Sequence, residues 1–236
     1  MRDPRTLTDA RLQLHWAAQL AATVGRTLAE PRADDSHTSF RWTADALVQE
    51  DRFRSGLRLR DLKLLLGDAE FALDGRTIDE GFAWLAARLP GLRKELNDPM
   101  PHHPVADGAP FSLRDAEAFE ELSRCYAEAA RLLRAIHDDV RCWPHHFDIA
   151  TLLELGGGKS IGAGRSPGDD SCGEPYWYVN HQPATTRRDL PPLAGGGTWH
   201  TEEWVGAILP MSRGGDAKAF LDSAVAAART LLSPRA

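Results

Sequence analysis

The sequence has few cysteines and no long apolar segment. Its three cysteines, Cys125, Cys142 and Cys172, are odd in number and form no CxxC pair. A disulfide framework is therefore not expected, and a reducing compartment fits this cysteine content best. The first residues lack the apolar core of a signal peptide, and no run reaches the ~18 apolar residues that a membrane span needs. The sequence therefore predicts a cytoplasmic protein without a membrane partner.

Basic residues are not in excess, because the 236 residues carry a formal net charge of -6 at pH 7. A general nucleic-acid binder would usually have a basic excess, so nucleic acid is not an expected partner. Arginine far outnumbers lysine, and its planar guanidinium suits the recognition of phosphate or carboxylate. A GC-rich genome would produce the same bias, so composition alone does not indicate a ligand.

Apolar residues recur every four positions near the start of the chain and predict a helix with one buried stripe. They are Leu12, Trp16, Leu20, Val24 and Leu28. Short strands are expected within 39–48, within 56–66 and at 71–73. The segment Thr77-Ile-Asp-Glu80 has the pattern of a capping box and predicts the start of a second helix.

A proline-rich connection at 93–111 precedes a second set of elements. A long helix is expected after Ser112, and a last helix, capped by Asp216, ends before Pro234. Between these helices, strands are expected at 146–155, 174–181 and 204–210, and the glycine-rich segment 156–173 is expected to be a long loop.

Both halves of the chain, 6–92 and 112–233, therefore read as a helix, three strands and a helix. Because no helix connects successive strands, antiparallel pairing is favoured. The sequence predicts an α+β fold, with a mainly antiparallel sheet flanked by helices. The two halves are expected to share one core, so that 1–236 forms a single compact domain.

The densest polar cluster begins at His146 and Asp148. On a strand these two side chains would point to the same face, so both could reach one metal ion. Glu174 opens the next predicted strand and could supply a third ligand. One nitrogen donor and two oxygen donors suit Zn²⁺ or Mn²⁺, with Mg²⁺ as a less favoured alternative. The sequence therefore predicts a divalent metal site formed by these three residues.

The predicted glycine-rich loop carries further charged residues. Lys159 and Arg165 are predicted to bind phosphate, and Asp169 is predicted to orient or deprotonate a water. The segment GGGKS is not a P-loop, because Leu153 stands where that motif needs a glycine. A structural interpretation stays open, since a His-His-x-Asp cluster can be a hydrogen-bond network and Pro-Gly-Asp-Asp is ordinary turn sequence. His15 is expected at the surface of the first helix, with a position in the same cleft as the alternative.

Five short motifs, taken in order along the chain, resemble a little-studied bacterial domain family of unknown function. They lie at Leu14–Trp16, Val24–Arg26, Trp143–Asp148, Gly164–Asp169 and Glu174–Val179. The resemblance is closest to a branch described as an unusual nucleotide phosphatase. It implies metal-dependent hydrolysis of nucleoside di- or triphosphates, with His146, Asp148 and Glu174 at the site and the glycine-rich loop over the phosphates.

The predicted function is therefore that of a hydrolase, a metal-dependent phosphohydrolase that releases phosphate from a small nucleotide substrate. The alternative is a non-catalytic module that binds a small anionic ligand. A third hypothesis is a structural or partner-binding protein, in which the polar cluster is only a hydrogen-bond network.

Overall fold

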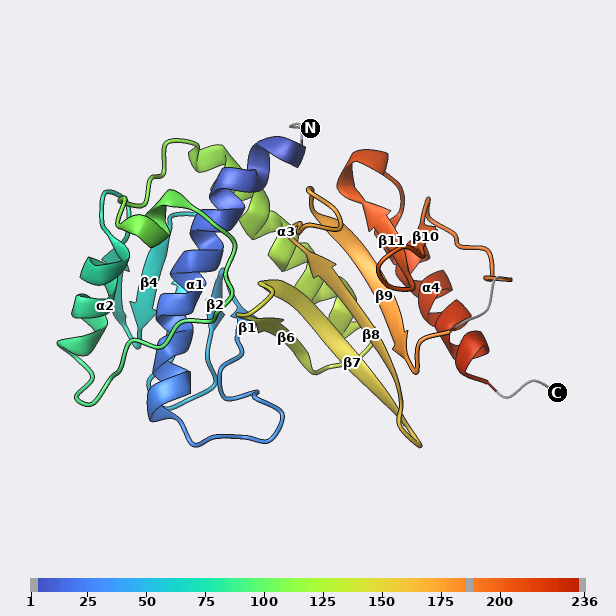
Figure 1. Cartoon of the computed structure of the whole chain (residues 1–236), viewed down its shortest axis with the longest axis horizontal. Helices are drawn as coiled ribbons and strands as arrows, with labels where there is room; N and C mark the ends of the chain where they lie inside the picture. The colour runs from blue at the N-terminus through green and yellow to red at the C-terminus, as the bar shows by residue number, and fades with distance from the viewer. Residues whose placement is uncertain (1–3, 186–188, 234–236) are drawn as a thin grey trace. The chain divides into compact units, whose positions relative to one another are not determined.

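The computed structural model describes residues 4–185 and 189–233 (Figure 1). Within these residues the chain forms four α-helices and two antiparallel sheets, of five and six strands. The predicted α+β class and the antiparallel pairing are therefore confirmed. No helix in the described part of the chain is long and apolar enough to cross a membrane.

The fold divides into two compact units. The N-terminal unit comprises Thr6–Glu128 and Arg141–Phe147, and the C-terminal unit comprises Met1–Arg5, Ala129–Val140 and Asp148–Ala236. The division passes through helix α3 (Ala116–Arg134) and strand β6 (Val140–Trp143). The proline-rich segment 93–111 belongs entirely to the N-terminal unit.

The N-terminal unit is built on a five-stranded meander. Helix α1 (Thr8–Leu28) is followed by β1 (Arg41–Thr43), β2 (Ala46–Val48), β3 (Ser55–Arg58), β4 (Lys63–Leu66), β5 (Ala69–Ala72) and α2 (Ile78–Ala86). The strands pair in chain order, β1-β2-β3-β4-β5. The stretches at 39–48 and 56–66 therefore contain turns and supply four short strands where two were expected. Figure 1 shows α1 lying across this sheet, where it contacts β3 and β4.

Helix α1 is buried on more of its circumference than the predicted stripe. Ala17, Ala18, Ala21 and Ala22 are all fully buried. The reason is that the proline-rich segment, expected as a connection, packs along the helix. Thr23 Oγ1 donates to the Glu95 carbonyl at 2.6 Å, for example. Small side chains let the helix approach both the sheet and this segment closely.

The N-terminal ends of two helices are capped as predicted. In α2, Thr77 Oγ1 accepts a hydrogen bond from the Glu80 amide, and the Glu80 carboxylate accepts one from the Thr77 amide. Helix α4 (Ala217–Leu232) starts with Asp216, whose carboxylate accepts from the Ala219 amide at 3.0 Å. Both caps satisfy backbone donors that the helix itself leaves unpaired.

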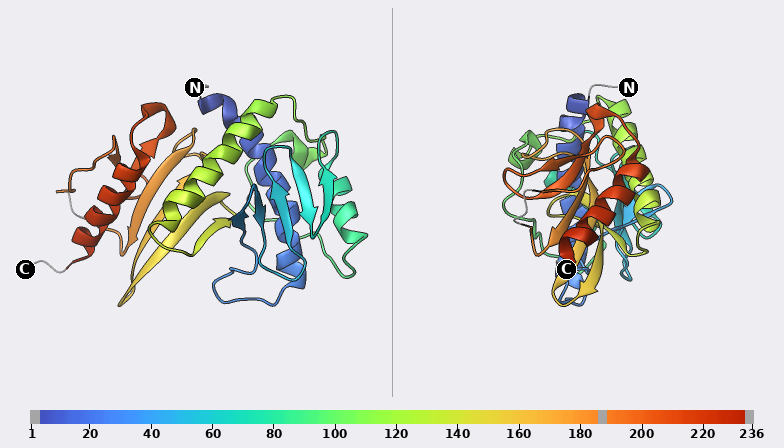
Figure 2. Two further views of the ribbon diagram at one scale, coloured as in Figure 1. Left: turned by 180° about the vertical axis from the view of Figure 1, so that it is seen from behind. Right: turned by 90° about the vertical axis from the view of Figure 1, so that its right-hand side faces the viewer.

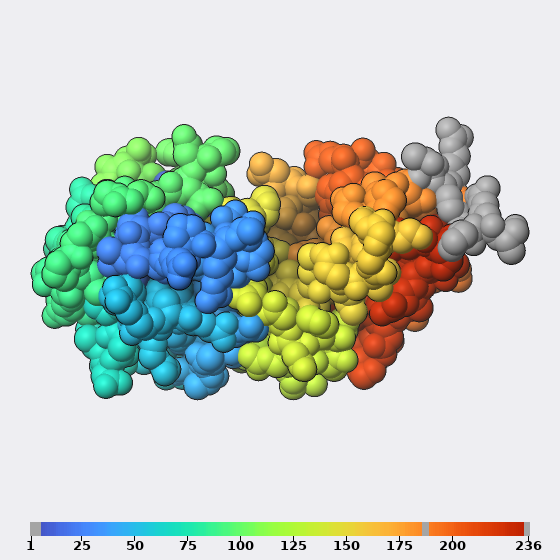
Figure 3. All heavy atoms as spheres, turned by 90° about the horizontal axis from the view of Figure 1, so that it is seen from below, coloured from blue at the N-terminus to red at the C-terminus, as the bar shows by residue number. Residues whose placement is uncertain are grey.

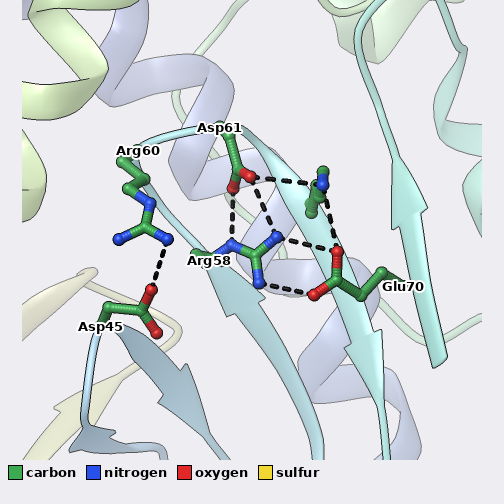
Figure 4. Close-up of polar contacts among 6 residues, drawn as sticks. Asp45, Arg58, Arg60, Asp61 and Glu70 are labelled. Carbon is green, nitrogen blue, oxygen red and sulfur yellow. Dashed lines mark hydrogen bonds and ion pairs between the residues drawn. The ribbon is translucent and has the colours of Figure 1, made fainter. Parts of the chain in front are cut away.

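The strand face opposite α1 carries an ion network rather than apolar side chains (Figure 4). Arg58 pairs with Asp61 at 2.9 Å and with Glu70 at 2.6 Å, and Lys63 pairs with Glu70 at 3.0 Å. The intervening positions Leu57 and Leu64 are fully buried. This alternation is typical of a sheet with one covered face and one solvated face.

The C-terminal unit is built on the larger sheet. Its strands are β6, β7 (Asp148–Gly156), β8 (Lys159–Ser166), β9 (Tyr176–Gln182), β10 (Thr198–His200) and β11 (Gly206–Pro210). The spatial order is β10-β11-β9-β8-β7-β6. Helix α4 contacts β8, β9 and β11 and lies across one face of the sheet (Figure 2).

Several sequence-based strand boundaries in this unit are wrong, since β9 and β11 also begin two residues later than expected. The strand expected at 146–155 begins only at Asp148, because the preceding residues form a turn in which the Phe147 amide donates to the Trp143 carbonyl. The long loop expected at 156–173 is instead a hairpin followed by a short loop. Gly156, Gly157 and Gly158, all with positive φ, make the turn, and Lys159–Ser166 is a central strand paired on both sides.

Candidate functional site

Two polar regions of the described structure, one in each unit, are candidate sites. The first is an acid–tyrosine network on the C-terminal sheet, formed by Asp148, Ser166, Asp169, Tyr176 and Tyr178. The Tyr178 hydroxyl donates to the Asp148 carboxylate. The Tyr176 hydroxyl donates to Asp169 Oδ2 at 2.6 Å, and the Ser166 hydroxyl donates to the same oxygen at 3.1 Å. The network therefore joins strands β7, β8 and β9 to the loop that follows β8.

Glycines in β8 make this arrangement possible. Gly164 lies directly opposite Tyr178 in the sheet register. A Cβ atom at Gly164 would lie 2.5 Å from the Tyr178 hydroxyl oxygen and from Cζ of the ring. The absence of a side chain thus lets the Tyr178 ring lie over β8 and reach Asp148 on β7. Gly162 makes room for Asn180 in the same way.

Both tyrosines in the network remain protonated. Burial raises the pKa of Tyr178 well above its usual range, and the Asp148 carboxylate raises it further. Burial also raises the pKa of Tyr176, with a second contribution from its hydrogen bond to Asp169. A buried phenol beside a carboxylate resists ionisation because its anion would lose hydration and face a like charge. These hydroxyls therefore act as hydrogen-bond donors at neutral pH.

The two predicted phosphate ligands lie away from this network. Lys159 Nζ donates to the Leu232 carbonyl at 2.8 Å, at the C-terminal end of α4. Arg165 stands between Gly164 and Ser166 on β8, so strand alternation directs it to the opposite face, the one that α4 covers. Its guanidinium lies 4.9 Å from the centre of the Trp177 ring, and the residue is 7% exposed.

The three predicted metal ligands have separate environments. Asp148 accepts from Tyr178, whereas Glu174 accepts from the Ser212 amide and hydroxyl, both at 2.6 Å. His146 lies in the turn before β7, with its ring centre 4.4 Å from that of His145. Across the described residues, no group of three or more His, Cys, Asp or Glu side chains is placed to hold a metal ion. The metal site formed by these three residues therefore stays a prediction.

The second place is a cavity of about 570 Å³ in the N-terminal unit. Three segments line it, and Figure 3 looks onto the face where the end of α1 and the loop after it lie. They are the end of α1 with the residues that follow it (28–32), the pair Ser36 and His37, and the turn between β2 and β3 (50–53). We refer to it as the loop cavity.

Buried Gln49 holds these segments together. Its Oε1 accepts from the Gly25 amide at 3.2 Å and from the Ser55 hydroxyl at 2.5 Å. Its Nε2 donates to the carbonyls of Thr38 at 3.0 Å and His37 at 3.4 Å. A Cβ atom at Gly25 would lie 2.3 Å from the His37 carbonyl, so only glycine lets the loop approach α1 this closely. The loop cavity is thus a built feature of the fold.

Arg32 and Arg52 are exposed cations at the loop cavity. Arg52 lies with its guanidinium carbon 4.6 Å from the centre of the Phe53 ring, and Arg32 Nη1 donates to Ser36 Oγ at 3.4 Å. Neither arginine pairs with an acidic side chain among the residues that the structure describes. Sequence reasoning missed both, because they stand 20 positions apart in polar turns and form no spacing motif.

Comparison of the chain with models of known protein families, with curated protein sequences and with solved structures finds no match. The resemblance to a nucleotide phosphatase branch therefore stays a prediction.

Proposed function

We propose that this protein is a binding module for a small anionic ligand, which it holds in the loop cavity. The observation that carries the proposal is the pair of guanidinium groups, Arg32 and Arg52, at a cavity of about 570 Å³. Pockets for small molecules commonly measure ≈ 300–1,000 Å³, so the loop cavity has a suitable size.

The chemistry of arginine supports an anion as the ligand. The guanidinium group presents a planar fork of N–H donors that matches carboxylate and phosphate oxygens in pairs. The stacking of Arg52 on Phe53 restricts its side chain while leaving its N–H edge available. His37, whose carbonyl accepts from Gln49, is a further polar group in the lining.

The test is a titration with inorganic phosphate, citrate and ADP, followed by amide chemical shifts. We expect saturable shifts in residues 28–37 and 50–53, and a loss of affinity of at least tenfold in Arg32→Gln and Arg52→Gln. Arg76→Gln is the matched control, because Arg76 is an exposed arginine of the same unit that pairs with Glu80 on α2. Shifts that spread evenly over the surface, or equal affinity in all three variants, would contradict the proposal.

A phosphohydrolase is the second candidate, and one observation favours it. Asp148 and Asp169 each accept a hydrogen bond from a tyrosine, and the rings of Tyr176 and Tyr178 are only 6.2 Å apart. Positioned carboxylates can transfer protons to or from a reacting group. The measurement is phosphate release from nucleoside di- and triphosphates, with and without a chelator. Release that is abolished by Asp148→Asn and by chelation would support a metal-dependent hydrolase over a binding module.

A further inference from the structure

The loop cavity carries acidic groups as well as arginines. Glu30, Glu50 and Asp51 all belong to its lining. Glu50 is already paired with Arg41 at 2.6 Å. Glu30 is exposed and makes no hydrogen bond or ion pair with any other described residue, so its carboxylate is available to a ligand.

The Asp51 side chain is held in a fixed conformation by the turn between β2 and β3. Its Oδ1 accepts from the backbone amides of Phe53 at 2.9 Å and Arg54 at 2.8 Å, which immobilises the side chain in the turn. Its Oδ2 is buried and has no hydrogen-bond partner among the described residues. Asp51 forms no ion pair with another described residue, so its negative charge favours a cation in the cavity that it lines.

The C-terminal end of α1 adds a partial negative charge at the cavity. The helix stops at Leu28, and Leu28 and Ala29 both line the cavity. Carbonyl groups in the last turn of a helix carry a partial negative charge and favour a nearby cation. An ammonium group would therefore be stabilised near Glu30 and Asp51, while the arginines favour an anion.

From this division of charge we infer that the ligand is zwitterionic, with an ammonium group and a carboxylate, as in a free amino acid or a short peptide. The carboxylate pairs with Arg32 or Arg52, and the ammonium pairs with the exposed Glu30, while Asp51 adds negative charge to the same lining. The inference rests on the proposed anion-binding function and narrows its ligand class.

The experiment uses trialanine as the probe, with N-acetyl-trialanine and trialanine amide as the forms that lack one terminal charge. Affinities are measured on the full chain by the amide shifts of residues 28–37 and 50–53. We expect trialanine to bind, and each blocked form to bind at least tenfold more weakly.

Two variants assign the ammonium site. Glu30→Gln removes the exposed carboxylate and should remove the preference for trialanine over its N-acetyl form. Asp51→Asn keeps an oxygen for the two turn amides but removes the negative charge, so it should weaken the same preference. Asp79→Asn is the matched control, because Asp79 is an exposed acid of the same unit outside the cavity.

The binding results distinguish the zwitterion inference from the proposed anion site. If N-acetyl-trialanine binds as well as trialanine, or if no peptide binds while phosphate does, the zwitterion inference is wrong and the proposed anion site stands. If neither phosphate nor any peptide shifts the cavity amides, both are wrong.

Discussion

The buried histidine of α1 makes the stability of the N-terminal unit depend on pH. His15 is 6% exposed, its Nε2 donates to the Pro144 carbonyl at 2.9 Å, and its ring stacks on Phe147 at 5.4 Å. The pKa of His15 is lowered from 6.5 to about 4, mainly by burial and with smaller contributions from Arg11, His146 and His145, although the hydrogen bond to Pro144 raises it. The native state therefore holds a neutral imidazole at a pH where the unfolded chain is already protonated.

The size and sign of this pH dependence follow from the linkage between proton binding and folding. Between pH 6.5 and about 4 the unfolded state binds one proton more than the native state at this position, so the free energy of unfolding rises with pH. The stabilising contribution is complete above pH 6.5 and is lost as the pH falls toward 4. A difference of about 2.5 pH units corresponds to roughly 3 kcal/mol, at ~1.36 kcal/mol per unit.

The assay is urea unfolding at pH values from 8 to 4, followed by tryptophan fluorescence, with wild type and His15→Gln compared. Glutamine keeps an N–H donor for the Pro144 carbonyl but does not titrate. We expect wild type to lose roughly 3 kcal/mol more than His15→Gln between pH 7 and pH 4. His102→Gln serves as the control, since His102 is exposed in the proline-rich segment. Parallel pH profiles for wild type and His15→Gln would refute the reasoning.

Three further changes should alter stability by predictable amounts, each measured by urea unfolding. Gly164→Ala places a Cβ 2.5 Å from the Tyr178 ring and should cost about 1–3 kcal/mol, whereas Gly173→Ala, with nothing within 4 Å, should cost far less. Tyr178→Phe removes a donor from the Asp148 carboxylate and should cost about 1–3 kcal/mol, and no loss at all would show that the bond does not stabilise the fold. Thr77→Ala removes the capping oxygen of α2 and should cost about 1 kcal/mol, while an unchanged unfolding midpoint would contradict the role of the cap.

Features that depend on neighbouring residues in the chain could be predicted from the sequence. The capping box of α2 and the Asp216 cap of α4 are set by side chains that reach backbone amides only three positions away. The antiparallel pairing followed from the absence of helices between strands. The burial of His15 could not be predicted, because it depends on Pro144 and Phe147, which are more than 120 positions away in the sequence.

The misassigned strand β8 shows why the candidate site was dispersed in the structure. Glycine disfavours strands in isolation, so Gly156 to Gly173 read as a loop. In the sheet, Gly162 and Gly164 are required by the partner strand, because Asn180 and Tyr178 occupy the space above them. Once 159–166 is a strand, Arg165 points to the face opposite Ser166 and Tyr178, and its role in phosphate binding stays a prediction.

The loop cavity could not be predicted from the sequence. Its arginines come from the segment after α1 and from the turn after β2, and each segment alone is an ordinary polar turn. Gln49 joins these segments into one site. Its side-chain amide forms hydrogen bonds with α1, with the loop after α1 and with β3. The four residues that hydrogen-bond to Gln49 are scattered over 25–55, so they form no spacing pattern in the sequence. A Gln49→Leu variant would therefore separate the walls of the cavity without touching either arginine, and ligand affinity should fall even though every charged group remains. If the affinity were unchanged, the arginines would bind anions as independent surface groups and the cavity would have no role.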